Sequence, residues 1–157
     1  MNLSTLIREL ISPETKIPFH WGEEYEDTVR VDYLQDPYEL WNNIHKIPFA
    51  DQPANLVTYP AMCLSPLQSA TIDGSVTRYR FILYAADQLL EDRSNYVFAL
   101  DAAEYIIRHW TREVAKFNDV LGVSLGELEP FTQKFADELA GYCTTVEIAL
   151  ESGIDEC

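Results

Sequence analysis

The sequence is short of basic residues. It has 11 lysines and arginines against 26 acidic residues, and its formal net charge is −15. Binding to nucleic acid by release of counterions needs a basic surface, so this composition argues against nucleic acid as a partner. The deficit is uneven: residues 78–116 hold six basic and six acidic groups, residues 1–77 four and eleven, and residues 117–157 one and nine. A neutral centre with acidic flanks is typical of a soluble surface, or of one that repels DNA, mimics it or meets a basic partner.

Cysteine and histidine are scarce, and their spacing fits no metal site. There is no CxxC pair, and no two histidines stand three or four residues apart, so a zinc site is not expected. Free thiols in a reducing compartment fit the odd number of cysteines. The acidic run at residues 23–27 lacks the glycine and the alternating ligands of a calcium loop. The residues considered are Cys63, Cys143, Cys157, His20, His45 and His109.

Catalytic and targeting motifs are also missing. The chain has no GxGxxG, P-loop or GxSxG motif, so we expect neither a cofactor nor an enzyme. No window approaches the roughly 18 apolar residues of a membrane span. The start, MNLSTLIRELISPE, has acids within its apolar pattern, unlike a secretory signal. We therefore expect a protein that is cytosolic when synthesised and has no membrane partner.

What the chain does have is enough apolar residues for a core. With 157 residues, of which 47% are hydrophobic, it is expected to form one domain over residues 1–150, followed by a flexible acidic tail at 151–157. Apolar spacing predicts a helix over residues 2–11. Residues 13–50 are expected to form an extended arm, with a short strand near 28–33 and a short helix capped by Asp36. Pro60 places the predicted strand 56–64 at a sheet edge or a bulge.

The second half of the chain gives clearer patterns. Asp73-Gly74 predicts a loose hairpin leading into a strand over residues 75–85, whose continuous apolar run favours a central, covered position. Ser94 is the expected cap of a long helix over residues 94–117. Its expected core stripe is Val97, Leu100, Ala103, Ile107, Trp110, Val114 and Phe117, and Glu104 and Arg108 form an exposed pair. Strands are expected over residues 131–136 and 140–150.

These elements predict an α+β fold. A small antiparallel sheet of the 56–64, 75–85 and 140–150 strands is covered by the 94–117 helix. One helix leaves the second face of the sheet open, so we expect the N-terminal helix or a second subunit to cover it. The aromatic residues of the arm are candidates for a subunit interface, although they could equally fold back on their own sheet. They are Phe19, Trp21, Tyr25, Tyr33 and Trp41.

The order of several short motifs resembles a known family. An Asn-Leu-x-x-Tyr-Pro strand starts at Asn55, a turn is marked by Gly74, and Tyr-x-Phe-x-Leu-Tyr-x-x-Asp runs over residues 79–87. Asp-x-Ser-Asn then precedes the long helix, and Leu-Ala-Gly-Tyr occupies residues 139–142. Over residues 1–150 this order is similar to the tail-terminator and neck-ring proteins of tailed bacteriophages, especially crAss-like and other Bacteroidetes-infecting phages. The insertion at residues 13–50 is longer than in simple terminators.

The resemblance implies a virion component without catalytic activity. Such proteins assemble in the host cytoplasm into sixfold or twelvefold rings between the portal and the tail, with portal, neck or tail proteins as neighbours. The genome passes through the ring, and an acidic bore would repel its phosphates. The candidate bore residues are Glu23, Glu24, Glu26 and Asp27. The competing hypothesis is a small acidic inhibitor or DNA mimic that binds a basic partner.

Overall fold

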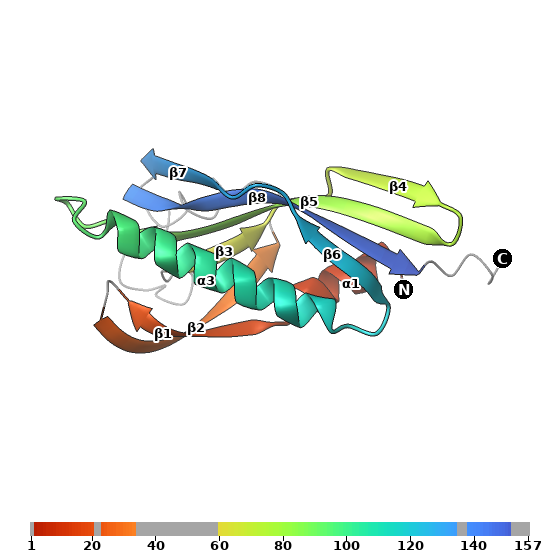
Figure 1. Cartoon of the computed structure of the whole chain (residues 1–157), viewed down its shortest axis with the longest axis horizontal. Coiled ribbons are helices and arrows are strands. Elements are labelled where there is room, and N and C mark those ends of the chain that lie inside the picture. The colour runs from red at the N-terminus through yellow and green to blue at the C-terminus, as the bar shows by residue number, and fades with distance from the viewer. Residues whose placement is uncertain (1, 21–22, 34–59, 135–137, 152–157) are drawn as a thin grey trace, which may run out of the picture.

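The computed structural model of the chain describes residues 2–20, 23–33, 60–134 and 138–151. Over these residues the fold is α+β, as predicted, with two helices and a mostly antiparallel sheet of eight strands (Figure 1). The helices are α1 (Leu3–Leu10) and α3 (Tyr96–Ala115). The strands are β1 (Glu14–His20), β2 (Glu23–Tyr33), β3 (Ala61–Leu64), β4 (Ser69–Asp73), β5 (Val76–Gln88), β6 (Val120–Leu125), β7 (Glu129–Lys134) and β8 (Glu138–Glu151).

The centre of the sheet is the long antiparallel pair of β5 and β8, in register from Val76 opposite Glu151 to Gln88 opposite Leu139. Each long strand is flanked on its other edge by two short ones: β3 and β4 pair with β5, and β6 and β7 pair with β8. Backbone bonds continue through both breaks. The Ser65 amide donates to the Ile82 carbonyl at 2.9 Å, and the Gly126 amide donates to the Thr145 carbonyl at 2.8 Å. Two interrupted strands therefore border the central pair.

The N-terminal part of the sheet differs from the prediction. The strand expected near residues 28–33 exists but begins at Glu23, and residues 14–20 form a second strand where an irregular arm was expected. The alternating pattern is weak here because aromatic and acidic residues are mixed along both strands. β2 then pairs in parallel with β3. The helix expected after Asp36 and the predicted strand residues before Pro60 lie outside the described residues.

Pro60 does not mark an edge. β3 lies between β2 and β5 in the strand order, so the prediction of an edge position is wrong. Pro60 immediately precedes the first strand residue, Ala61. A proline at this point removes no ladder donor, which is why an internal strand tolerates it.

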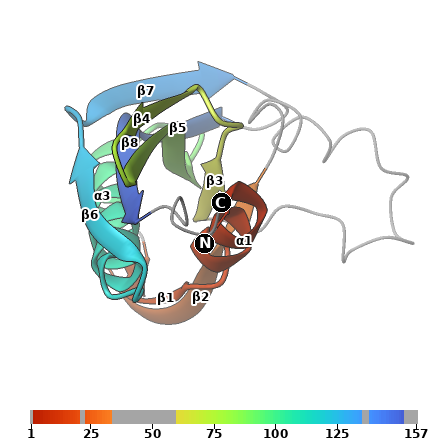
Figure 2. The same ribbon diagram turned by 90° about the vertical axis from the view of Figure 1, so that its right-hand side faces the viewer.

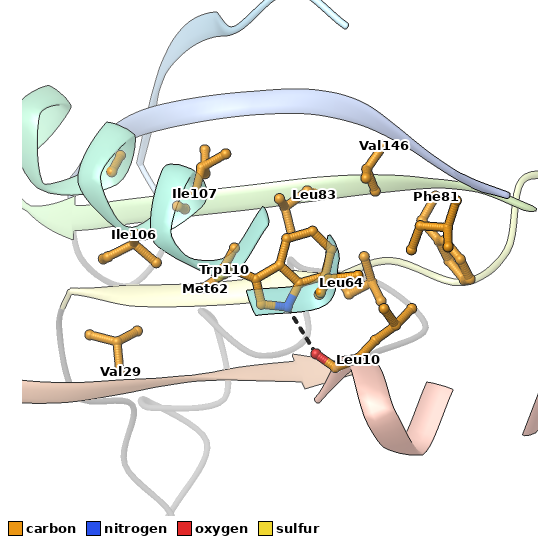
Figure 3. Packing of buried hydrophobic residues seen from close by; sticks show 14 of the residues in the cluster. Leu10, Val29, Met62, Leu64, Phe81, Leu83, Ile106, Ile107, Trp110 and Val146 are labelled. Carbon is orange, nitrogen blue, oxygen red and sulfur yellow. Dashed lines mark hydrogen bonds between the residues drawn. The ribbon is translucent and has the colours of Figure 1, made fainter. Parts of the chain in front are cut away.

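The core lies between the curved sheet and both helices. Seen along the long axis, the strands curl around α3 (Figure 2). Phe81 and Leu83 of β5 are buried together with Leu10 of α1 and Trp110 of α3 (Figure 3). The indole Nε1 of Trp110 donates to the Leu10 carbonyl oxygen at 2.9 Å, which satisfies a carbonyl at the end of α1. Both helices therefore cover the same face of β5.

The opposite face of β5 is also buried in its middle. Cys63 and Ala86 have no exposed surface, and the ring of Tyr84 lies edge-on to Phe131 of β7, with centroids 6.1 Å apart. The predicted central position of this strand is confirmed. Since both helices lie on the face of Phe81, the N-terminal helix does not cover the second face, and of the two expected covers only a second subunit stays a prediction.

The cap of the long helix lies one residue later than predicted. Its N-cap is Asn95, not Ser94. The Asn95 side chain does not cap the helix; its Oδ1 accepts from the Leu90 amide at 2.8 Å and its Nδ2 donates to the Gln88 carbonyl at 3.0 Å. A buried asparagine thus fixes the loop between β5 and α3.

The predicted core stripe of this helix is right in its second half and wrong at its start. Ala103, Ile107, Trp110 and Val114 are buried as expected, but Val97 is 63% exposed. Small residues replace it at the sheet: Ala99, Ala102 and Ala103 have no exposed surface. The helix therefore approaches β8 closely here, and Val97 faces outward.

The three C-terminal strands agree in part with the prediction. β6 was not predicted, β7 begins two residues before the expected strand, and β8 contains the expected one. The alternation of this strand predicts that Tyr142, Thr144, Val146, Ile148 and Leu150 share one face. The structure confirms this, since Tyr142 is partly buried against the core and the other four are buried.

Candidate assembly surface

The sequence-predicted interface residues fall on the β1–β2 hairpin or outside the described residues. Phe19 of β1 pairs in register with Glu24, and Tyr33 of β2 pairs with Leu64 of β3. Tyr25 also belongs to β2. Trp21 and Trp41 lie outside the described residues. The backbone thus brings three of the five aromatic positions into two adjacent strands.

The four acidic positions predicted to face a channel all belong to β2. Glu23 pairs with His20, Glu24 with Phe19, and Asp27 with Ile17. Successive positions of a strand belong to opposite faces of a sheet. A register shift between the Ile17 and Phe19 pairs interrupts this alternation in β2. Asp27 and Glu24 lie opposite Ile17 and Phe19, which are two residues apart on β1, so positions 24 and 27 share one face, and positions 23 and 26 belong to the other.

A second hairpin, β4–β5, projects from one end of the molecule (Figure 1). A two-residue turn of Gly74 and Ser75 connects the strands, and Gly74 has φ +62°, a left-handed conformation that glycine adopts without strain. The predicted hairpin is confirmed, with a tighter turn than expected. All five β4 residues are exposed, and Ile72 is 74% exposed. Backbone pairing with β5 thus holds β4 in place, although no residue of β4 is buried.

One face of this hairpin is tied to β8 by charges. Arg80 contacts Glu147 at 3.3 Å, and Arg78 lies 3.6 Å from Glu147 and 3.9 Å from Asp73. These ion pairs are partly exposed, so each contributes little to stability. Ile72 pairs with Thr77 and so belongs to the other face, which is the face of the core.

Further exposed apolar residues lie at the opposite end of the long axis, where α3 starts (Figure 1). Val97 is 63% exposed, Phe98 is 43% exposed, and Leu90 in the preceding loop is also exposed. The molecule thus presents apolar side chains at two separate ends.

A hollow of about 220 Å³ lies between α3 and the junction of β6 and β7. Ile107, Leu125 and Leu128 give it an apolar lining, and Arg108 and Arg112 are the basic residues beside them. Sequence reasoning missed this hollow because it did not predict β6. Its complete lining is Glu104, Ile107, Arg108, Thr111, Arg112, Leu125 and Leu128.

The titratable side chains that could support chemistry have structural partners. His109 Nδ1 lies 3.1 Å from the Thr15 hydroxyl, which joins α3 to β1. Burial, reinforced by the charge of Glu129, raises the pKa of the Cys143 thiol, so the nucleophilic thiolate is disfavoured. Asp92 accepts the Ser94 amide at 3.0 Å, and this bond lowers the pKa of its carboxyl group. Among the described residues, no three of His, Cys, Asp and Glu are grouped closely enough to hold a metal ion.

The described helices include none with the length and apolar character required to cross a membrane. No protein-family model matches the sequence, and a search of curated proteins finds no match. The function is therefore inferred from the surfaces described above.

Proposed function

We propose that this protein is a virion structural subunit that assembles with copies of itself into a ring at the head–tail junction or in the tail of a tailed phage. The observation that carries this proposal is the projecting β4–β5 hairpin with its exposed Ile72. Ordering a hairpin costs conformational entropy, and this one buries little of β4 in return. A protein contact at the hairpin would provide that burial.

Two unlike surfaces favour a head-to-tail assembly. Ile72 lies on a projecting hairpin, whereas the hollow beside α3 is recessed and partly apolar. A contact between unlike surfaces generates a ring when the rotation between copies closes, and a filament when it does not. The resemblance to tail-terminator and neck-ring proteins favours closure.

The acidic residues of β2 are candidates to line the bore of the proposed ring. A bore lined with carboxylates repels DNA phosphates and lets the genome slide. Because the register places Glu24 and Asp27 on one face of the strand and Glu23 and Glu26 on the other, these two pairs are tested separately. Replacing the pair that lines the bore with glutamines is expected to slow genome delivery, and replacing the other pair is expected to leave it unchanged.

The alternative function is an acidic inhibitor or DNA mimic. Such a protein presents unpaired carboxylates at phosphate-like spacing. In the described residues, Glu104, Glu138 and Glu147 each lie within 4 Å of an arginine nitrogen, which reduces their local field. Together with the neutral centre of the chain, which has six basic and six acidic groups over residues 78–116, this pairing favours the ring proposal.

Quantitative mass spectrometry of purified phage particles, with the major capsid protein as the internal standard, tests the proposal. We expect about six or twelve copies per particle, as one closed ring of that symmetry requires. Absence from the particles, together with a stoichiometric complex with a basic protein in infected cells, would favour the alternative.

A further inference from the structure

The hollow between α3 and the β6–β7 junction is small and of mixed character. Small-molecule sites usually enclose about 300–1,000 Å³, and this hollow has about 220 Å³. Ile107 lines it from α3 and is itself 1% exposed, while Leu125 and Leu128 come from the sheet side. The size and apolar lining suit one branched aliphatic side chain with part of its backbone.

We propose that this hollow receives the tip of the β4–β5 hairpin from a second copy of the chain, with Ile72 as the inserted side chain. The inference rests on the proposed self-assembly and names its contact. Ile72 is the most exposed large hydrophobic residue described. A single apolar anchor in a pocket is the usual centre of a protein interface.

The hairpin cannot reach the hollow of its own chain. Ile72 pairs with Thr77, which pairs with Leu150, whereas Leu125 pairs with Val146. Ile72 and Leu125 therefore differ by four residues along the sheet, about 13 Å, and by three strand spacings across it, about 14 Å. The folded sheet fixes this separation, so only another copy can insert Ile72.

Charge supports the same pairing. Arg112 lines the hollow and forms no ion pair with any described residue, while Arg108 is held by Glu104 at 2.8 Å. Asp73 follows Ile72 at the turn and is highly exposed, with only a 3.9 Å contact to Arg78. Asp73 belongs to the other face of the hairpin. If β4 enters with its edge first, Ile72 lies in the hollow of the second copy and Asp73 lies at the rim. There the long side chain of Arg112 can reach the Asp73 carboxylate.

The proposed contact joins two different surfaces that every copy carries. Each subunit then offers one hairpin and one hollow, which is the requirement for a heterologous interface. Blocking either half in one copy leaves the other half of that copy functional. This property allows a test by mixing two defective variants.

The first variant, Ile72→Lys, blocks the hairpin, because a lysine would face Arg112 in an apolar hollow. The second, Thr111→Arg, fills the hollow from α3 with a residue of high helix propensity. The matched control is Val97→Lys, which replaces another exposed aliphatic residue, 63% exposed against 74% for Ile72, at the other end of the molecule. Circular dichroism of each variant checks that the fold is retained.

Light scattering after size exclusion measures the assemblies. We expect the wild type and Val97→Lys to form the same oligomer, and each blocked variant alone to be monomeric. An equimolar mixture of the two blocked variants should give a one-to-one dimer that grows no further, because only one functional hairpin and one functional hollow remain in each pair.

Three results would overturn the inference: a mixture that stays monomeric, a blocked variant that assembles like the wild type, or a wild type that never self-associates. The proposed function can fail separately. If the chain is present in particles at the copy number of a ring and Ile72→Lys still assembles, the ring uses another contact and only this inference is wrong.

Discussion

The two halves of β5 share one hydrogen-bonded ladder and have opposite surroundings. In residues 81–87 one face is fully buried, since Phe81, Leu83 and Ala85 have no exposed surface, and the other face is partly to fully buried. Residues 76–80 pair just as regularly with β4 and β8, yet Arg78 and Arg80 are exposed, as is all of β4. The hydrogen-bonded pairing of residues 76–80 with β4 and β8 is therefore regular although this half of β5 is exposed.

The buried half of β5 stabilises the fold, and the exposed half forms part of the molecular surface. Apolar burial supplies most of the free energy of folding, so the half containing Phe81 stabilises the domain. The half next to β4 adds little burial and extends the core-facing side of the sheet beyond both helices (Figure 1). We infer that the first half specifies the structure and the second is available for assembly.

The largest expected contrast is between Phe81 and Ile72. Phe81→Ala removes a fully buried ring and is expected to lower the free energy of unfolding by about 3–5 kcal/mol. Ile72→Ala removes an exposed side chain and is expected to change it by less than about 0.5 kcal/mol. Urea denaturation of both variants measures the contrast, and equal losses would show that the hairpin contributes to the core.

A second contrast compares two positions of β8. A Cβ added to Gly141, which pairs with Ala86 in the buried half, would lie 2.6 Å from the Ala86 Cα and 2.8 Å from the Ala85 carbonyl carbon. Gly141→Ala should therefore force the central strands apart and cost about 3 kcal/mol. Ala149→Val, opposite Arg78 in the exposed half, serves as the control and should be nearly neutral. Thermal unfolding distinguishes them, and a neutral Gly141→Ala would contradict the close approach.

The third prediction concerns the hydrogen bond that joins the two helices over the buried half. Trp110→Phe leaves the Leu10 carbonyl without its buried donor, and the expected loss is about 1–3 kcal/mol. Ile107→Val, which shortens a neighbouring side chain without removing a hydrogen bond, is the control for the effect of volume. If the two variants lose the same free energy, the indole bond contributes nothing measurable beyond packing.

The fourth prediction uses the pH dependence of Cys143, which pairs with Tyr84 in the buried half. Its thiol pKa is raised in the folded state by burial and by Glu129. The associated stability is thus fully present below the pKa of the unfolded thiol and is lost as the pH rises through the folded pKa. In a Cys63→Ala/Cys157→Ser variant, which keeps Cys143 as its single thiol, alkylation near pH 8.5 should be slower in the native protein than in urea. Equal rates under both conditions would show that the thiol is not perturbed.

The smallest effect is expected for the ion pairs of the exposed half. Arg80→Gln removes a contact of 3.3 Å between side chains that are both solvent-accessible, and should change the unfolding free energy by less than about 0.5 kcal/mol. High salt should abolish even this difference. A loss above about 1 kcal/mol that persists in high salt would show that this ion pair contributes substantially to the stability of the fold.

Sequence patterns predicted the parts of the fold in which one period continues over many residues. The stripe from Ala103 to Val114 repeats with the helical period over several turns, and β8 alternates cleanly between two faces. The pattern failed where neighbours from elsewhere in the chain decide the structure. Pro60 precedes a strand that became internal only through its parallel pairing with β2, and Val97 is exposed because alanines allow the helix to approach the sheet.

The candidate site was less predictable for the same reason. The hairpin at Gly74 has a local turn signal, so the sequence indicated it. The hollow requires β6 and β7 to meet α3, a contact between elements that no local pattern encodes. Only the fold brings Ile107 and Leu125 together.

Native mass spectrometry of the purified chain over a range of concentrations tests most directly whether the exposed half of β5 serves assembly. We predict monomer and one closed oligomer with few intermediates, and the loss of that oligomer in Ile72→Lys. A chain that is monomeric at every concentration, or a two-fold dimer that Ile72→Lys leaves unchanged, would contradict the account.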